Sequence, residues 1–240
     1  MLLARNAIAD RKDRLALIVG AGSGLSASLA RAFAGAGYRI ALAARSVGKL
    51  DGLCAETSAS AFACDATKPK EVDDLFRQVD GLPGPLDVVV FNAGYRTRGP
   101  IAELDPAEVE KTLMVSAFAG FLVGQQAARR MEPRGSGAIL FAGASAGIKG
   151  YPRSAPFAMG KFALRGLAQS MARELAPKGV HVAHFVIDGG IRSAERPDGP
   201  KKPDALLDPD AIAKSYLAMV DQPRSAWTWE IELRPWVETF

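Results

Sequence analysis

The sequence predicts a three-layer α/β domain, in which helices cover both faces of a doubly wound, parallel seven-stranded sheet. Short β-prone apolar runs alternate along the chain with longer segments of helical period. The apolar runs are continuous, which is typical of strands buried on both faces, and the helical segments supply right-handed crossovers between them. A chain of 240 residues, of which 48% are hydrophobic and 23% charged, fits a single globular domain of this kind.

Seven apolar runs are expected to form the strands, in chain order: residues 15–20, 39–44, 59–64, 86–91, 137–143, 180–187 and 228–233. Two helix starts are clear between them. Asp105 is an N-cap residue followed by Pro106 and the acidic Glu108, and Asp208 with the proline after it repeats the first part of that pattern. The helix after Asp105 is expected to run to about Met131.

The single domain is expected to span residues 1–240, with a short N-terminal extension at 1–13. The segment 193–207 is rich in proline and charge, so it has little apolar area to bury. We therefore expect it to form a lid.

Charge and cysteine content narrow the functional classes. Thirty basic and 26 acidic residues leave a net charge of +4, and their scatter along the chain argues against a nucleic-acid partner. Cys54 and Cys64 form neither a disulfide framework nor a CxxC motif, as in a reducing compartment. The apolar start is too short for a secretory signal, and no stretch approaches the length of a membrane span, so we expect a cytoplasmic protein without a membrane partner.

The two histidines do not indicate a metal site. His181 and His184 are three positions apart in a predicted strand, and an odd separation places side chains on opposite faces. We expect core or surface histidines and no bound metal.

A glycine-rich turn follows the first predicted strand and opens a segment of helical period. Glycines allow positive φ and let the backbone approach a pyrophosphate, whose charge is met by the N–H groups and the dipole of the helix N-terminus. The turn therefore predicts dinucleotide binding. The residues expected to hold the pyrophosphate are Gly20, Gly22, Ser23, Gly24 and Leu25.

The end of the second predicted strand indicates which dinucleotide is preferred. A carboxylate at this place commonly binds a free ribose 2′-hydroxyl, but the sequence has Ala44 followed by Arg45. An arginine can pair with a 2′-phosphate, so we expect NADP(H) to be preferred over NAD(H).

Further residues carry a family resemblance. Cys64-Asp65 closes the third strand, Asn92-Ala93-Gly94 follows the fourth, and Lys161 lies in the helix before the sixth. With the glycine turn, they resemble the short-chain dehydrogenase/reductase family, a Rossmann-like fold, over roughly residues 14–235.

The resemblance implies roles at the cofactor. Asp65 would accept a hydrogen bond from the adenine amino group, and Asn92-Ala93-Gly94 would line the adenine ribose. The Ile191 backbone and the Ser193 hydroxyl would hold the nicotinamide amide. Two positions depart from the family pattern, since Ser26 replaces its third glycine and Asp188 replaces the proline after the sixth strand.

The catalytic positions depart further. The family tyrosine, four residues before the lysine, is Phe157 here, which cannot pass a proton to a carbonyl oxygen. The family serine falls on Ala144, and strand alternation would point the neighbouring Ser145 to the other side. The family asparagine falls on Ser116, so only Lys161 is kept.

These features leave three hypotheses open. The first is an oxidoreductase that transfers a hydride between NADP(H) and a small or medium apolar carbonyl, alcohol or activated alkene, with water, Tyr95 or Tyr151 as the proton source. The second is a catalytically inactive NADP(H)-binding sensor or scaffold, and the third is an enzyme whose chemistry needs no acid. The resemblance also implies a homodimer or homotetramer formed through the helices that begin near Asp105 and Arg153.

Overall fold

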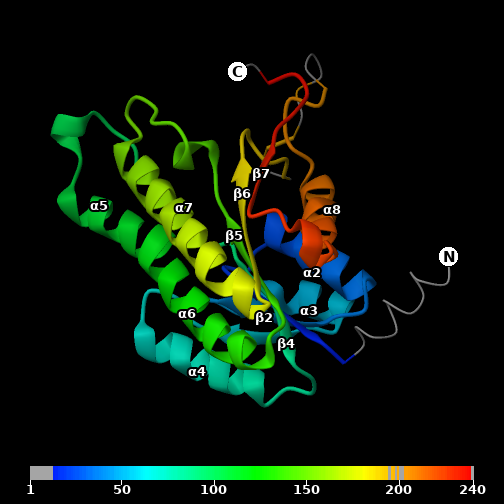
Figure 1. Ribbon diagram of the computed structural model, residues 1–240. Coiled ribbons are helices and arrows are strands. Elements are labelled where there is room, and N and C mark those ends of the chain that lie inside the picture. The colour runs from blue at the N-terminus through cyan, green and yellow to red at the C-terminus, as the bar shows by residue number, and fades with distance from the viewer. Residues whose placement is uncertain (1–12, 194–195, 198, 200–202, 239–240) are drawn as a thin grey trace.

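The fold is a three-layer α/β sandwich around a parallel sheet, as the sequence predicts (Figure 1). It is seen in a computed structural model that describes residues 13–193, 196–197, 199 and 203–238. Within these residues the sheet has seven strands, in the order β3-β2-β1-β4-β5-β6-β7. The chain leaves β1 toward one edge, returns, and then builds the other half of the sheet from β4, so the order reverses between β1 and β4.

The seven predicted strands are confirmed to within two residues at each end. Their bounds are β1 Leu15–Val19, β2 Arg39–Ala44, β3 Ser60–Ala63, β4 Leu86–Phe91, β5 Ala138–Ala142, β6 His181–Ile187 and β7 Glu230–Leu233. The helices are α2 Leu25–Gly35, α3 Asp51–Thr57, α4 Pro69–Asp80, α5 Pro106–Leu113, α6 Ala119–Met131, α7 Ala155–Leu175 and α8 Pro209–Val220. Every residue of β1, β4, β5 and β6 is buried, which explains why their sequences are continuous apolar runs.

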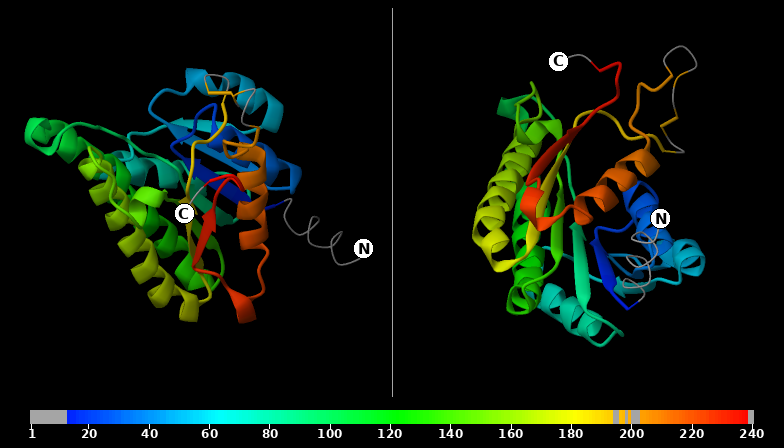
Figure 2. Two further views of the ribbon diagram at one scale, coloured as in Figure 1. Left: turned by 90° about the horizontal axis from the view of Figure 1, so that it is seen from above. Right: turned by 45° about the vertical axis from the view of Figure 1, so that its right-hand side comes forward.

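The two faces of the sheet carry separate apolar cores. Helices α4, α6 and α7 pack on one face, where Phe76, Phe91 and Phe141 are fully buried. Helices α2, α3 and α8 pack on the other face, where Phe185 stacks on Tyr216. Figure 2 shows the sheet between the two layers from above and in an oblique view.

Both predicted helix starts are capped as expected. The Asp105 carboxylate accepts a hydrogen bond from the backbone N–H of Ala107, and the Asp208 carboxylate accepts one from Asp210. The helical segment after Asp105 does reach Met131, but it is not one regular α-helix. A π-helical stretch at Met114–Phe118 separates α5 from α6, and such insertions are frequent at functional sites.

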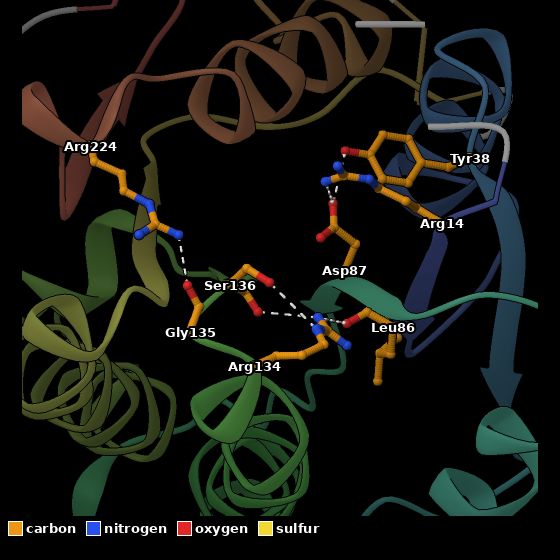
Figure 3. Close-up of polar contacts among 8 residues, drawn as sticks. All are labelled: Arg14, Tyr38, Leu86, Asp87, Arg134, Gly135, Ser136 and Arg224. Atoms are coloured by element: carbon orange, nitrogen blue, oxygen red, sulfur yellow. Dashed lines mark hydrogen bonds and ion pairs between the residues drawn. The ribbon is translucent and has the colours of Figure 1, made fainter. Parts of the chain in front are cut away.

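Three arginines bind acceptors on neighbouring segments at the edge of the sheet where the amino ends of the strands lie (Figure 3). Arg14 lies 3.3 Å from the buried carboxylate of Asp87, Arg134 donates to the carbonyl oxygen of Leu86, and Arg224 donates to that of Gly135. Each of these guanidinium groups has acceptors from a neighbouring segment, so their charges serve the fold.

The expected extension at 1–13 lies outside the described residues except for Asp13, and the expected lid at 193–207 lies partly outside them. The described ends of that segment are joined, because Ile191 and Leu207 form a parallel bridge and Arg192 donates to the Leu207 carbonyl oxygen. Among the described residues, no helix is long and apolar enough to cross a membrane.

Candidate functional site

The glycine turn after β1 forms a cradle open to a ligand. Gly20 has a φ of +86°, and a Cβ atom there would lie 2.4 Å from the backbone nitrogen of Ala93, so only glycine fits. At Gly22 and Gly24, a Cβ atom would meet no described atom within 4 Å. Within the described chain, no side chain caps the start of α2 and its first turn holds no acid, so its N–H groups can receive an anion.

Ser26, which replaces a glycine of the family pattern, has a structural role that its sequence position did not reveal. Its hydroxyl donates to the carbonyl oxygen of Gly20 at 3.0 Å and accepts from the side-chain amide of Asn92 at 2.7 Å. The serine is 2% exposed. It therefore ties the cradle to the end of β4, where the family pattern would leave only close packing.

A cavity of about 450 Å³ adjoins the cradle at the carboxyl ends of β1, β2 and β4. Arg45 and Asp65 line it on one side, and Asn92, Ala93 and Gly94 line it on another. The structure thus brings together the residues that the sequence assigns to the adenosine half of the cofactor. Two further cations on the lining, Lys49 and Lys111, were not predicted.

Asp65 keeps one carboxylate oxygen available. Its Oδ1 atom accepts hydrogen bonds from the backbone and hydroxyl of Thr67, at 3.0 and 2.7 Å. Burial opposes ionisation of this carboxyl, but the hydrogen bonds from Thr67 and the nearby charges of Lys68 and Arg45 together outweigh it and lower the pKa. Asp65 is therefore ionised, with Oδ2 left to accept from a ligand.

A second cavity, of about 970 Å³, continues from the first, since Asn92 and Gly94 line both. It lies at the carboxyl ends of β4, β5 and β6 and holds most of the predicted catalytic positions. They are Ala144, Tyr151, Phe157 and Lys161, and the predicted nicotinamide residue Ile191 lines the same space. Ser145 lines it as well. Ser145 reaches the cavity, contrary to the prediction that it points to the other side, because β5 ends at Ala142 and strand alternation does not continue into the turn.

Lys161 is the buried cation of this cavity. It is 6% exposed, and its Nζ atom donates to the carbonyl oxygen of Ala142 at 2.7 Å. Burial lowers the pKa of its ammonium to about 8. The ring of Phe157 lies beside it, with the ring centre 5.8 Å from Nζ. Position 157 therefore faces the lysine, as the spacing of four residues predicts, but brings no hydroxyl.

Two predicted catalytic residues lie off the cavity lining. The Tyr95 hydroxyl donates to the Glu108 carboxylate, and the Lys111 ammonium covers its ring at 4.1 Å. Ser116 is fully buried in the π-helical stretch, where it donates to the Tyr95 carbonyl oxygen and packs against Gly160. Of the two candidate proton donors, only Tyr151 borders the cavity, with 40% of its surface exposed.

The loop after β6 is held by Asp188. Its carboxylate lies 3.3 Å from the Lys149 ammonium and 3.2 Å from the Arg234 guanidinium, so it joins the loop after β5 to the segment after β7. Ser193, which is predicted to hold the nicotinamide amide with Ile191, lines a third cavity with Ser23 and Gly24, and its hydroxyl accepts a hydrogen bond from the Arg196 backbone.

Both histidines are buried in β6. His181 stacks on Trp227, and His184 lies behind the cavity wall, where its Nδ1 atom is 3.0 Å from the Glu230 carboxylate. Burial lowers the pKa of His184 to about 4, so it is neutral at pH 7. In the described part of the chain, no group of three or more histidine, cysteine or acidic residues could hold a metal ion.

The lining of the larger cavity also holds four arginines that the sequence does not predict as site residues: Arg96, Arg98, Arg153 and Arg196. They come from three loops far apart in the sequence, so no local motif marks them as a group. The nearest signal was the pair at 96 and 98, directly after the Asn92-Ala93-Gly94 turn.

Comparisons with known proteins agree with this geometry. A family model described as short chain dehydrogenase matches residues 14–196, which contain the cradle and Lys161. An uncharacterized oxidoreductase of Staphylococcus aureus is 28% identical over 229 residues, which cover 93% of this chain and 97% of the relative. The crystal structure of a short-chain dehydrogenase from Rhodopseudomonas palustris has a TM-score of 0.81 at 36% identity, covering 93% of this chain and 99% of that one. A metagenomic short-chain oxidoreductase in complex with NADP has a TM-score of 0.81 at 28% identity, covering 93% and 97%.

Proposed function

The chain belongs to the short-chain dehydrogenase family and is an NAD(P)-dependent oxidoreductase, and we propose that it transfers a hydride between NADP(H) and a carbonyl, alcohol or activated alkene. One observation carries the proposal. Two adjoining cavities, which share Asn92 and Gly94, run from the glycine cradle to the buried Lys161 along the carboxyl edge of the sheet. This is the edge at which α/β sheets bind their ligands, at the point where the strand order reverses.

The fit of the cofactor rests on the cradle and on the charge of the smaller cavity. The pyrophosphate would lie against Gly22 and Gly24, where no described atom occupies the space. Arg45, with Lys49 on the same lining, supports a 2′-phosphate and therefore NADP(H) over NAD(H). A similar protein has been solved in complex with NADP, which agrees with this preference.

When bound, the reduced nicotinamide supplies the hydride for reduction of the substrate. The Lys161 ammonium would hold the nicotinamide ribose hydroxyls, and its hydrogen bond to Ala142 fixes its position in the cavity wall. The Tyr151 hydroxyl or a water molecule would supply the proton, since the side chains of Phe157 and Ala144 carry no proton that they could donate. We expect most of the rate to come from positioning.

A second candidate function is an inactive NADP(H)-binding sensor or scaffold. Phe157, Ala144 and the buried Ser116 favour it, because each stands where the family pattern has a proton-transfer side chain. Purified protein with NADPH and a panel of ketones, aldehydes and enoyl compounds separates the two functions. Consumption of NADPH, followed by the absorbance of the reduced nicotinamide, supports the enzyme. Tight NADPH binding without consumption by any compound supports the sensor or scaffold.

The outer faces of α6, of the end of the π-helical stretch before it, and of α7 support a homodimer or homotetramer. Phe118 stacks on Phe121, and both rings are exposed, at 37% and 42%. Met159 and Phe162 on α7 are exposed at 49% and 45%. Apolar side chains gathered on two neighbouring helices favour a subunit interface. Sedimentation of Phe121→Ser and Phe162→Ser variants tests it, because a smaller species than the parent is expected.

A further inference from the structure

The larger cavity is cationic. Arg96 and Arg98 reach it from the loop after β4, Arg153 from the loop before α7, and Arg196 from the segment after β6. Lys161 adds a fifth positive charge in the wall. Separate parts of the chain thus converge on one space with groups of the same sign.

Within the described part of the chain, the four guanidinium groups lack acidic partners. None of them forms an ion pair or donates a side-chain hydrogen bond to another described residue. The arginines at the opposite edge of the sheet differ, since Arg14, Arg134 and Arg224 all have acceptors (Figure 3). Partial burial, together with the nearby charges of Arg98 and Arg196, lowers the pKa of Arg96. Charges that repel one another in this way are left for a ligand to neutralise.

The two acidic residues on the cavity lining, Asp188 and Glu238, do not neutralise the positive charge of the arginines. Asp188 lines the cavity, but its carboxylate is already paired with the Lys149 ammonium and the Arg234 guanidinium. Glu238 lines the cavity too, but it is one carboxylate against four arginines.

We propose that this cluster, Arg96, Arg98, Arg153 and Arg196, binds an anionic group of the substrate, so that the compound oxidised or reduced carries a carboxylate or phosphate. The guanidinium fork donates paired hydrogen bonds to both kinds of oxyanion. This substrate class replaces the apolar one expected from the sequence, and it rests on the proposed function.

The cluster is close to the reacting centre. The Arg96 guanidinium carbon lies 4.8 Å from the centre of the Phe157 ring, and the Lys161 ammonium lies 5.8 Å from the same centre. Arg96 and Lys161 therefore both lie against the ring of Phe157. The anionic group of the substrate is accordingly a few bonds from its carbonyl or hydroxyl carbon, as in a short oxo acid or a phosphorylated hydroxy ketone.

The test measures binding, without turnover. Calorimetric titrations at low ionic strength use protein saturated with NADP⁺, which cannot reduce a ketone. The probes are two matched pairs: levulinate with methyl levulinate, and dihydroxyacetone phosphate with dihydroxyacetone. At least one anion should bind tenfold or more tightly than its neutral partner, and which pair shows the preference distinguishes a carboxylate from a phosphate site.

Substitutions of single arginines test whether the anion binds at this cluster. Arg96→Gln and Arg98→Gln should each weaken binding of the preferred anion tenfold or more, while NADP⁺ binds as before. Arg173→Gln, which removes an exposed arginine of α7 outside the cavity, is the matched control and should change neither affinity.

Three results would overturn the proposal: equal binding of anionic and neutral probes, equal weakening by Arg173→Gln, or competition between the anion and NADP⁺. Failure of the proposed function is a separate result, because it would show as absence of NADP⁺ binding in the first titration or of NADPH consumption in the panel.

Discussion

The Nζ atom of Lys161 lies 5.8 Å from the centre of the Phe157 ring, one turn away along α7. A tyrosine at position 157 would present its hydroxyl to the same cavity, where a nearby ammonium favours the phenolate and so lowers the phenol pKa. With phenylalanine at this position, Lys161 can still hold a ligand in place, but there is no phenol hydroxyl whose pKa it could lower. The roles of the individual site residues can be tested by substitution.

Restoring the missing hydroxyls should raise the rate of carbonyl reduction. Phe157→Tyr alone should gain little, because no hydroxyl at position 144 then helps to orient the carbonyl. With Ala144→Ser added, we expect at least a roughly tenfold gain on a generic diketone or aromatic aldehyde, a conservative share of the ~10²–10⁴ that general-acid catalysis supplies. Ala163→Ser, which adds a hydroxyl at an exposed position of α7, is the control. Loss of a robust parental activity in Phe157→Tyr would instead show that Phe157 shapes a working pocket.

Substitutions at two glycines of the cradle should affect different properties: one lowers the affinity for NADPH, and the other lowers the free energy of unfolding. The methyl group added by Gly22→Ala would have no described atom within 4 Å. The unfolding free energy should therefore change by no more than about 0.5 kcal/mol, while the affinity for NADPH falls tenfold or more. Gly20→Ala, at positive φ and against the Ala93 backbone, should cost at least about 1–3 kcal/mol of stability. Urea unfolding and NADPH fluorescence titration measure the two effects. Unchanged NADPH affinity in a stable Gly22→Ala protein would exclude the cradle as the pyrophosphate site.

Arg45 should set the cofactor preference. We expect NADPH to bind more tightly than NADH by about 1–3 kcal/mol, the range for a charge-assisted contact, and Arg45→Ala to narrow the difference. Arg39→Ala, at the opposite end of the same strand, is the matched control and should leave the preference unchanged. Equal affinities of the parent for both cofactors would contradict the assignment.

Lys161 should make stability rise with pH in a defined range. Its pKa is about 8 in the folded chain and near 10.5 when exposed, so between these values the unfolded chain binds more protons. The unfolding free energy therefore gains up to about 3 kcal/mol from this group as the pH rises from 8 to 10.5. Lys161→Met should remove that gain, whereas Lys178→Met, at an exposed site, should not. Urea midpoints at pH 7 and pH 10 measure it, and parallel pH dependence in the parent and Lys161→Met would refute the buried ammonium.

The strands and the cradle could be predicted because their causes are local. A strand such as β4 is covered on both faces and must be apolar throughout, and Gly20 follows the first strand at a turn that no side chain could enter. The helix caps at Asp105 and Asp208 likewise depend on neighbours two or three residues away.

The rest of the site depends on contacts between distant segments. Ser26 joins Asn92 across 66 positions, and Asp188 joins residues of two different loops. The arginine cluster of the larger cavity is assembled in the same way, so its charge was invisible in a sequence whose basic residues look scattered. The hydrogen bond of Tyr95 to Glu108 on α5 is a further contact between separate segments.

Transfer of deuterium from the cofactor tests the central claim most directly. The protein is incubated with NADPH that carries deuterium at both C4 positions of the nicotinamide and with carbonyl compounds that include levulinate and dihydroxyacetone phosphate, and the products are analysed by mass spectrometry. The account predicts one deuterium on the former carbonyl carbon of a reduced anionic product, and none with Lys161→Met. Labelled NADPH that binds tightly but yields no deuterated product from any compound would contradict it.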